Sequence, residues 1–300
     1  MNTVVRGNLM GIGALLLWCT LVGMIRSITE EVGVAGGTAV IYSIGVLATS
    51  LRNGLPNPKK IPKMYLLAAG FFFVAYEILL SQGIGMSESP RQALEVGMLN
   101  YLWPGLTIVF SIAILKTKLR WYVWPGIALS LLGMYWCLAA NGGLDIGGFL
   151  DNLRATPLPY LFGFGAGISW ALYSNLSVRY ANDANAVSWF FIVIAILLWS
   201  NFFMRGEELR FPGYWFLLQL VFLGVILGFS YSLWETGIHK GNFIFLAVCS
   251  YFTPAASMLF AGALLQAMPP LGFWAGVGLV IGGSLICWAA SLHKPMPKAN

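Results

Sequence analysis

The feature that most limits how this chain can fold is a series of long apolar runs that continues from one end of the sequence to the other. A helix needs about 20 apolar residues to cross roughly 30 Å of hydrocarbon. Runs of that size, beginning with Gly7 to Ile25, are separated here by short polar loops. Hydrophobic residues make up 58% of the chain and charged residues 9%, whereas about a quarter of the residues in soluble domains are charged. A water-soluble fold is therefore excluded.

The runs are apolar on every side, as in LLAAGFFFVAYEILL at residues 66–80. The strands of a membrane β-barrel would instead alternate in character over about ten residues. We therefore predict an all-α polytopic membrane protein with ten transmembrane helices. We place these helices near residues 7–26, 36–51, 64–85, 92–115, 121–140, 158–180, 186–203, 214–238, 242–266 and 271–292.

The basic residues predict the orientation of these helices, because short cytoplasmic loops carry an excess of Lys and Arg. With the N-terminus inside, the outer side holds five basic residues, Arg26, Arg91, Arg154, Arg205 and Arg210. The inner side holds twelve: Arg6, Arg52, Lys59, Lys60, Lys63, Lys116, Lys118, Arg120, Arg179, Lys240, Lys294 and Lys298. We therefore expect both termini to be cytoplasmic. The net charge of +6 then faces anionic lipid and indicates no nucleic-acid partner.

Four pairs of similar segments occur in the same order in the two halves of the chain, at offsets of 150 to 154 residues. GIGALLLW (11–18) matches GFGAGISW (163–170), and SQGI (81–84) matches ETGI (235–238). NYLWP (100–104) matches SYFTP (250–254), and WPGIALSLLG (124–133) matches WAGVGLVIGG (274–283). We predict two five-helix repeats, 1–150 and 151–300. Because five is odd, the second repeat is inverted, which places a substrate cavity near the midplane and permits alternating access.

These paired motifs resemble the drug/metabolite transporter superfamily of ten-helix proteins with two EamA-type domains. The resemblance extends over nearly the whole chain, and within the superfamily the sequence is most similar to bacterial inner-membrane exporters of aromatic amino acids, which implies a bacterial inner-membrane location. It implies transport of an aromatic amino acid (Phe, Tyr or Trp), or of a related amphipathic metabolite, from the cytoplasm by a protein that functions as a monomer. Other metabolites or cationic drugs of the same superfamily, and a passive channel-like facilitator, are the alternatives.

Eight aromatic residues lie near the middles of their predicted helices, away from the interfacial belts where Trp and Tyr usually gather. Packing inside the bundle accounts for part of this set, and we assign the rest to a cavity that stacks an aromatic ligand. The eight are Trp18, Tyr42, Tyr76, Tyr101, Trp103, Trp170, Tyr173 and Tyr251. Tyr101 and Trp103 are about 200° apart on a regular helix. They line one cavity only if Pro104 distorts the helix, as Pro254 would in the second repeat.

Glu77, Glu95 and Glu235 are acidic residues within predicted spans, where a charged carboxylate costs about 2.5–3.5 kcal/mol even on the lenient scale. Glu77, beside the midplane aromatics, is a candidate to bind an ammonium group or a proton, and the alternative is a helix-packing role. We expect Glu235 and His239 to belong to the membrane interface. Neutral hydrogen bonds to a ligand are expected from Asn100, with Asn175, Ser250 and Thr253 as further candidates.

An enzyme is not supported by the sequence. Neither HExxH nor GxxxxGK[ST] occurs, and the four cysteines lie singly in apolar runs without metal-ligand spacing. We therefore expect no catalytic residues, no metal site and no cofactor. A channel would require a filter loop or rings of charge, and neither is visible.

Overall fold

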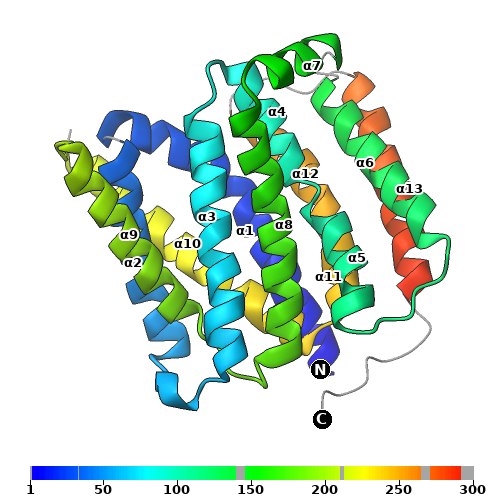
Figure 1. Cartoon of the computed structure of the whole chain (residues 1–300), viewed down its shortest axis with the longest axis horizontal. Coiled ribbons are helices and arrows are strands. Elements are labelled where there is room, and N and C mark those ends of the chain that lie inside the picture. The colour runs from blue at the N-terminus through cyan, green and yellow to red at the C-terminus, as the bar shows by residue number, and fades with distance from the viewer. Residues whose placement is uncertain (1, 33, 140–145, 210–212, 265–270, 292–300) are drawn as a thin grey trace. The chain divides into compact units, whose positions relative to one another are not determined.

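The structure is a computed structural model that describes residues 2–32, 34–139, 146–209, 213–264 and 271–291, and all regular elements within these ranges are helical (Figure 1). The chain forms two compact units. Unit 1 comprises Met1–Leu66 and Ala181–Asn242, and unit 2 comprises Leu67–Tyr180 and Phe243–Asn300. Each unit thus combines segments from both halves of the sequence.

Unit 1 is built around a single long helix, α10 (Tyr214–Lys240), which packs against both α1 (Thr3–Val32) and α2 (Val34–Asn53). The fourth helix, α9 (Val187–Arg205), packs on α2. The contact between α1 and α10 depends on glycine, because a Cβ atom at Gly237 would lie 2.7 Å from the Cα of Gly11. Small residues of this kind allow helix backbones in membranes to approach closely.

Unit 2 contains two tightly packed helix pairs. One pair joins α3 (Gly70–Gly85) to α8 (Pro157–Tyr180), and the other joins α6 (Val123–Ala139) to α13 (Leu271–Ser291) (Figure 1). Between α6 and α13, a Cβ atom at Gly133 would lie 2.5 Å from the backbone nitrogen of Val280, so a larger residue would force the helices apart.

Two helices of unit 2 are interrupted at the repeated motifs that end in proline. The predicted span 92–115 consists of α4 (Pro90–Asn100) and α5 (Trp103–Ile114). The predicted span 242–266 consists of α11 (Phe243–Cys249), a 3₁₀ turn (Ser250–Phe252) and α12 (Thr253–Leu264). Pro104 and Pro254 lack the N–H that would bond the carbonyls of Asn100 and Ser250, and their rings crowd those carbonyls.

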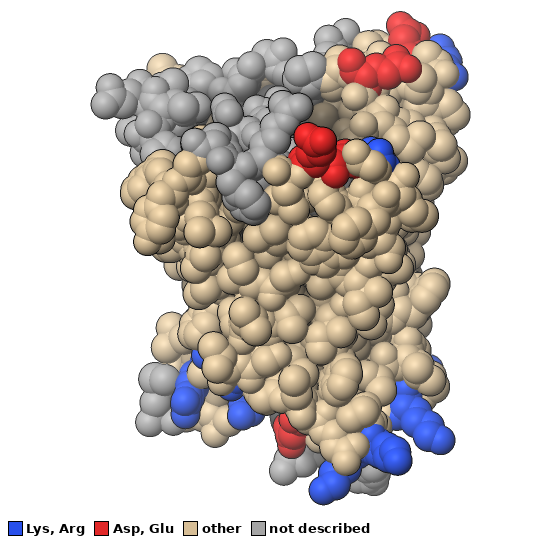
Figure 2. All heavy atoms as spheres, turned by 90° about the vertical axis from the view of Figure 1, so that its left-hand side faces the viewer, with Lys and Arg blue, Asp and Glu red and all other residues tan. Residues whose placement is uncertain are grey.

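The predicted all-helical polytopic fold is confirmed, and each predicted span corresponds to a helix, or to two helices in tandem. In the described part of the chain, six helices are long and apolar enough to cross a membrane, and two shorter helices are also apolar. On the face shown in Figure 2, charged side chains gather toward the two ends and the surface between them is uncharged. Three short elements were not predicted, a ten-residue helix α7 (Ile146–Ala155), a 3₁₀ turn (Pro58–Lys60) and a π-helical turn (Tyr65–Ala69).

Candidate substrate site

The side chain of Trp170 on α8 lies at the centre of an aromatic cluster in unit 2. Its ring centroid is 4.7 Å from that of Tyr76, 5.0 Å from Tyr173, 5.9 Å from Phe73 and 6.0 Å from Trp103. These separations suit edge-to-face and tilted aromatic contacts. The cluster combines rings from α3, α5 and α8 in a mostly buried position.

Polar groups adjoin this cluster at Tyr76. The Asn100 side chain hydrogen-bonds the Tyr76 hydroxyl, and Glu77 and Tyr101 interact with Tyr76 electrostatically. Asn100 is 7% exposed, and its Oδ1 atom has no hydrogen-bond partner among the described residues. A buried acceptor of this kind costs free energy unless something donates to it, so a ligand donor is a suitable partner for Asn100.

Tyr101 and Tyr251, which the repeat pairs with each other, meet in a second cluster of unit 2. Tyr251 is 1% exposed and packs with Met134 and Val280, and Tyr101 packs against this group. A Cβ atom at Gly105 would lie 2.6 Å from the Tyr251 hydroxyl oxygen, so glycine is required there. The Tyr251 hydroxyl has no hydrogen-bond partner within the ranges described. Tyr101 thus packs against the Tyr251 group, whereas Trp103 contacts Trp170. The two rings at the interruption before Pro104 therefore belong to different clusters.

One turn along α8, Asn175 is completely buried and joins α8 to α5. Its Nδ2 atom donates to the carbonyl oxygens of Thr107 (3.0 Å) and Ala171 (2.9 Å). Its Oδ1 atom and the Ser174 hydroxyl have no hydrogen-bond partners in the described part of the chain. The helix that carries Trp170 therefore also carries buried polar atoms that lack hydrogen-bond partners among the described residues.

Two predicted site residues belong to unit 1 instead. Trp18 contacts Tyr231 and Trp234 of α10, each with ring centroids 5.3 Å apart. Tyr42 contacts Phe191 at 5.4 Å. The other predicted residues lie in unit 2: Tyr76, Glu77, Asn100, Tyr101, Trp103, Trp170, Tyr173 and Tyr251. The candidate substrate site is therefore the unit 2 cluster alone.

Sequence reasoning missed Phe73, which is fully buried and contacts Trp170 and Tyr173. A signal was present, because Phe73 lies three residues before Tyr76 and such residues share one face of a helix. Glu95 and Glu235 are completely buried, whereas Glu77 is half-buried. Glu235, which the sequence predicts near the membrane interface together with His239, has its carboxylate enclosed by protein.

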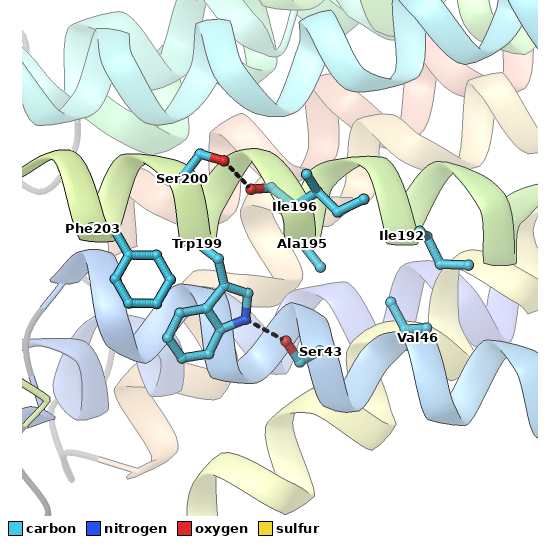
Figure 3. A pocket seen from close by; sticks show the side chains of 8 residues that line it. All are labelled: Ser43, Val46, Ile192, Ala195, Ile196, Trp199, Ser200 and Phe203. Atoms are coloured by element: carbon cyan, nitrogen blue, oxygen red, sulfur yellow. Dashed lines mark hydrogen bonds between the residues drawn. The ribbon is translucent and has the colours of Figure 1, made fainter.

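A groove of about 450 Å³ lies between α2 and α9 in unit 1 (Figure 3). Its polar side chains bond within the protein: Trp199 Nε1 donates to Ser43 Oγ at 2.9 Å, and Ser200 Oγ donates to the Ile196 carbonyl at 2.8 Å. The remaining lining is mostly apolar. The groove therefore suits hydrocarbon better than a zwitterionic solute, and we do not assign it to substrate.

A membrane-embedded helical protein with interrupted helices, buried aromatic rings and unpaired polar atoms at the interruptions has the features of a solute transporter. The chain belongs to the EamA-like transporter family, whose model matches residues 5–139 and 157–289.

Curated relatives match nearly the full length of the chain. The aromatic amino acid exporter YddG of Salmonella typhimurium is 38% identical over 96% of this chain and 99% of its own. The aromatic amino acid exporter YddG of Escherichia coli is 38% identical over 95% of this chain and 98% of its own length. The YddG protein of Ancylobacter novellus is 26% identical over 93% of this chain and 96% of its own length. A solved crystal structure with 25% identity superposes with a TM-score of 0.78, covering 95% of this chain and 97% of that one.

Proposed function

We propose that this protein exports aromatic amino acids from the cytoplasm across the bacterial inner membrane by alternating access. The observation that carries the proposal is the ring cluster around Trp170, with Asn100 Oδ1, which has no hydrogen-bond partner in the described ranges, beside Tyr76. The similarity to curated aromatic amino acid exporters supports the same substrate class.

The cluster offers the interactions that such a zwitterion needs. An aromatic side chain can join the rings around Trp170, where each aromatic contact contributes about 0.5–1.5 kcal/mol beyond burial. Asn100 Oδ1 and the half-buried Glu77 carboxylate are acceptors for an ammonium group. Removing any of these groups is expected to weaken binding more than it weakens folding.

The test is transport by purified protein in proteoliposomes, with labelled phenylalanine and a panel of competitors. Tyrosine and tryptophan should compete, leucine should compete weakly, and glycine should not. Phenethylamine keeps the ring and the ammonium group but lacks the carboxylate, so stronger competition by it than by phenylalanine would favour cationic amphipathic substrates. Equal competition by leucine and phenylalanine would contradict an aromatic site.

A matched pair of variants connects transport to the cluster. Trp170→Leu should impair phenylalanine uptake. Trp124→Leu should not, because Trp124 is 50% exposed on α6. Equal loss in both variants would show that the effect is not specific to the cluster.

We further propose that both termini are cytoplasmic, that 1–150 and 151–300 are inverted repeats and that the monomer is the functional form. The charge distribution and the collinear motifs support the first two. A reporter fused after Asn300 that is active only in the periplasm would contradict the topology.

A further inference from the structure

A buried acid, a histidine and a tyrosine form a cluster in unit 1 that the transport proposal does not use. Glu235 and Tyr65 are completely buried, and the His239 side chain is 9% exposed. The Tyr65 hydroxyl lies 2.5 Å from Glu235 Oε1, and His239 Nε2 lies 3.3 Å from the same oxygen. Ionisable groups enclosed within a membrane protein are costly, and they commonly mark ion or proton sites.

The hydrogen bonds fix the direction of donation within this cluster. The backbone N–H of Ala186 donates to the Tyr65 hydroxyl at 3.0 Å, so that hydroxyl gives its own proton to Glu235. His239 Nε2 also faces Glu235 Oε1, and a protonated Nε2 donates to that oxygen when Glu235 is ionised. Glu235 thus accepts from two donors. A hydrogen bond to a charged acceptor contributes about 1.5–3 kcal/mol, against about 0.5–1.5 kcal/mol for a neutral one.

The residues of the cluster lie next to the places where the chain passes from one unit to the other. The chain passes between the two units three times, after Leu66, after Tyr180 and after Asn242. Tyr65, Ala186 and His239 lie close to the first, second and third of these passages. A π-helical turn, Tyr65–Ala69, spans the first passage, and such turns are frequent at functional sites. The cluster therefore ties together the segments that must absorb any motion between the units.

Other charged groups occur on the elements around the cluster. They lie on α1, α2, the loop before Tyr65, the turn before α9 and the end of α10: Arg6, Arg52, Lys59, Lys60, Lys63, Asp183 and Lys240. Arg52 is half-buried, and its guanidinium carbon lies 4.4 Å from the Phe229 ring centroid. The others are exposed, so solvent and salt screen them.

We propose that Glu235, with Tyr65 and His239, is a proton-binding site that holds the three passages together when the carboxylate is ionised and loosens them when it takes up a proton. The ligand is the proton itself, which converts the carboxylate to a carboxylic acid and removes its charge. The link to transport rests on the proposed function, but the proton site does not.

Amide hydrogen exchange tests this directly, with purified protein in lipid nanodiscs and no substrate. Peptides covering the three passages are compared between about pH 8 and pH 5, with labelling times scaled for the intrinsic pH dependence of exchange. In the unmodified protein, exchange at all three passages should rise several-fold on acidification relative to peptides from α6 and α13. An unchanged ratio across this range would overturn the proposal.

Two variants give a matched comparison. Glu235→Gln keeps the shape but cannot ionise, so its passages should exchange fast at every pH. Glu95→Gln alters the other completely buried glutamate that bonds a tyrosine, and it should keep the normal response. A normal response in Glu235→Gln, or its loss in Glu95→Gln, would also overturn the proposal. Should Glu235→Gln fail to fold, the unmodified protein and Glu95→Gln still decide the matter.

Transport assays separate this proposal from the proposed function. If no aromatic amino acid is transported but the exchange response is present, the substrate assignment fails and the proton site stands. If phenylalanine is transported and the exchange response is absent, the proposed function stands and the proton site fails.

Discussion

Units 1 and 2 each bury one glutamate against a tyrosine hydroxyl, but the neighbours of the two carboxylates differ. In unit 1, Glu235 bonds Tyr65 and faces the titratable ring of His239. In unit 2, the Tyr160 hydroxyl donates to Glu95 Oε2 at 2.5 Å, and the Asn152 amide donates to it at 3.1 Å. Asn152 cannot change its charge. The difference indicates a site that responds to protons in unit 1 and a structural tether for α7 in unit 2.

The backbones of the two units differ as well. The main helix of unit 1, α10, runs for 27 residues without interruption. Unit 2 interrupts two helices and leaves polar atoms at Asn100 and Tyr251 without partners among the described residues. An unbroken helix transmits displacement along its length, whereas an interruption frees backbone and side-chain groups for a ligand. We therefore assign binding to unit 2 and proton response to unit 1.

The largest expected effect comes from the aromatic centre of unit 2. Trp170→Leu removes several ring contacts worth about 0.5–1.5 kcal/mol each, so the KM for phenylalanine should rise on the order of tenfold or more. Trp234→Leu changes an equally enclosed tryptophan of unit 1 and should lower the melting temperature with little change in KM. Equal changes in KM would remove the functional distinction between the units.

The structural role of Glu95 predicts the next largest effect. Glu95→Leu leaves the buried Tyr160 hydroxyl without its acceptor, at a cost of about 1–3 kcal/mol, and it also removes the acceptor of the partly exposed Asn152 amide. Glu95→Gln keeps an acceptor and should cost less. Thermal unfolding in detergent measures both variants. Equal melting temperatures for the two would show that the hydrogen bonds contribute little.

The helix interruption can be tested by restoring a backbone donor. Pro104→Ala allows α4 to continue into α5 and alters the positions of Tyr101 and Trp103, so the KM should rise several-fold while stability is maintained. Pro125→Ala is the control, because Pro125 lies in the first turn of α6, where backbone N–H groups lack helical partners. An unchanged KM in Pro104→Ala would separate the interruption from binding.

The smallest effect is expected at the groove of unit 1. Trp199→Phe removes the hydrogen bond to Ser43, which should lower the free energy of unfolding by about 0.5–1.5 kcal/mol. The KM for phenylalanine should not change, because we place the substrate in unit 2. A clear rise in KM would move part of the substrate path to the groove.

The sequence predicted the helices well because apolar length directly determines which segments can cross a bilayer. It also selected Trp170, Tyr76 and Trp103, whose rings lie together in the structure, because aromatic residues far from the interfaces are unusual; their role as a substrate site stays a prediction. It could not predict the Glu95–Tyr160 contact, because the partners are 65 residues apart and neither residue type specifies the other.

The sequence also did not predict which helices form each of the two units. Hydropathy locates each helix but does not say which helices pack together, and that depends on close contacts such as that of Gly237 with Gly11. The α7 helix was missed because ten residues with charged positions are too short to give a transmembrane signal.

The discontinuous course of unit 1 has a consequence for biosynthesis. Its first two helices end before Leu66, but α10, on which both pack, is finished only near Asn242, 176 residues later. At about 5–20 residues per second, α1 and α2 remain in the bilayer for roughly 9–35 s without their main partner. A nascent chain stalled after α8 would therefore present the α1 face that carries Gly11, and the α2 surface that packs on α10, to lipid and to membrane proteases. Ribosome pausing in the second half of the message would then determine how much of the first half survives.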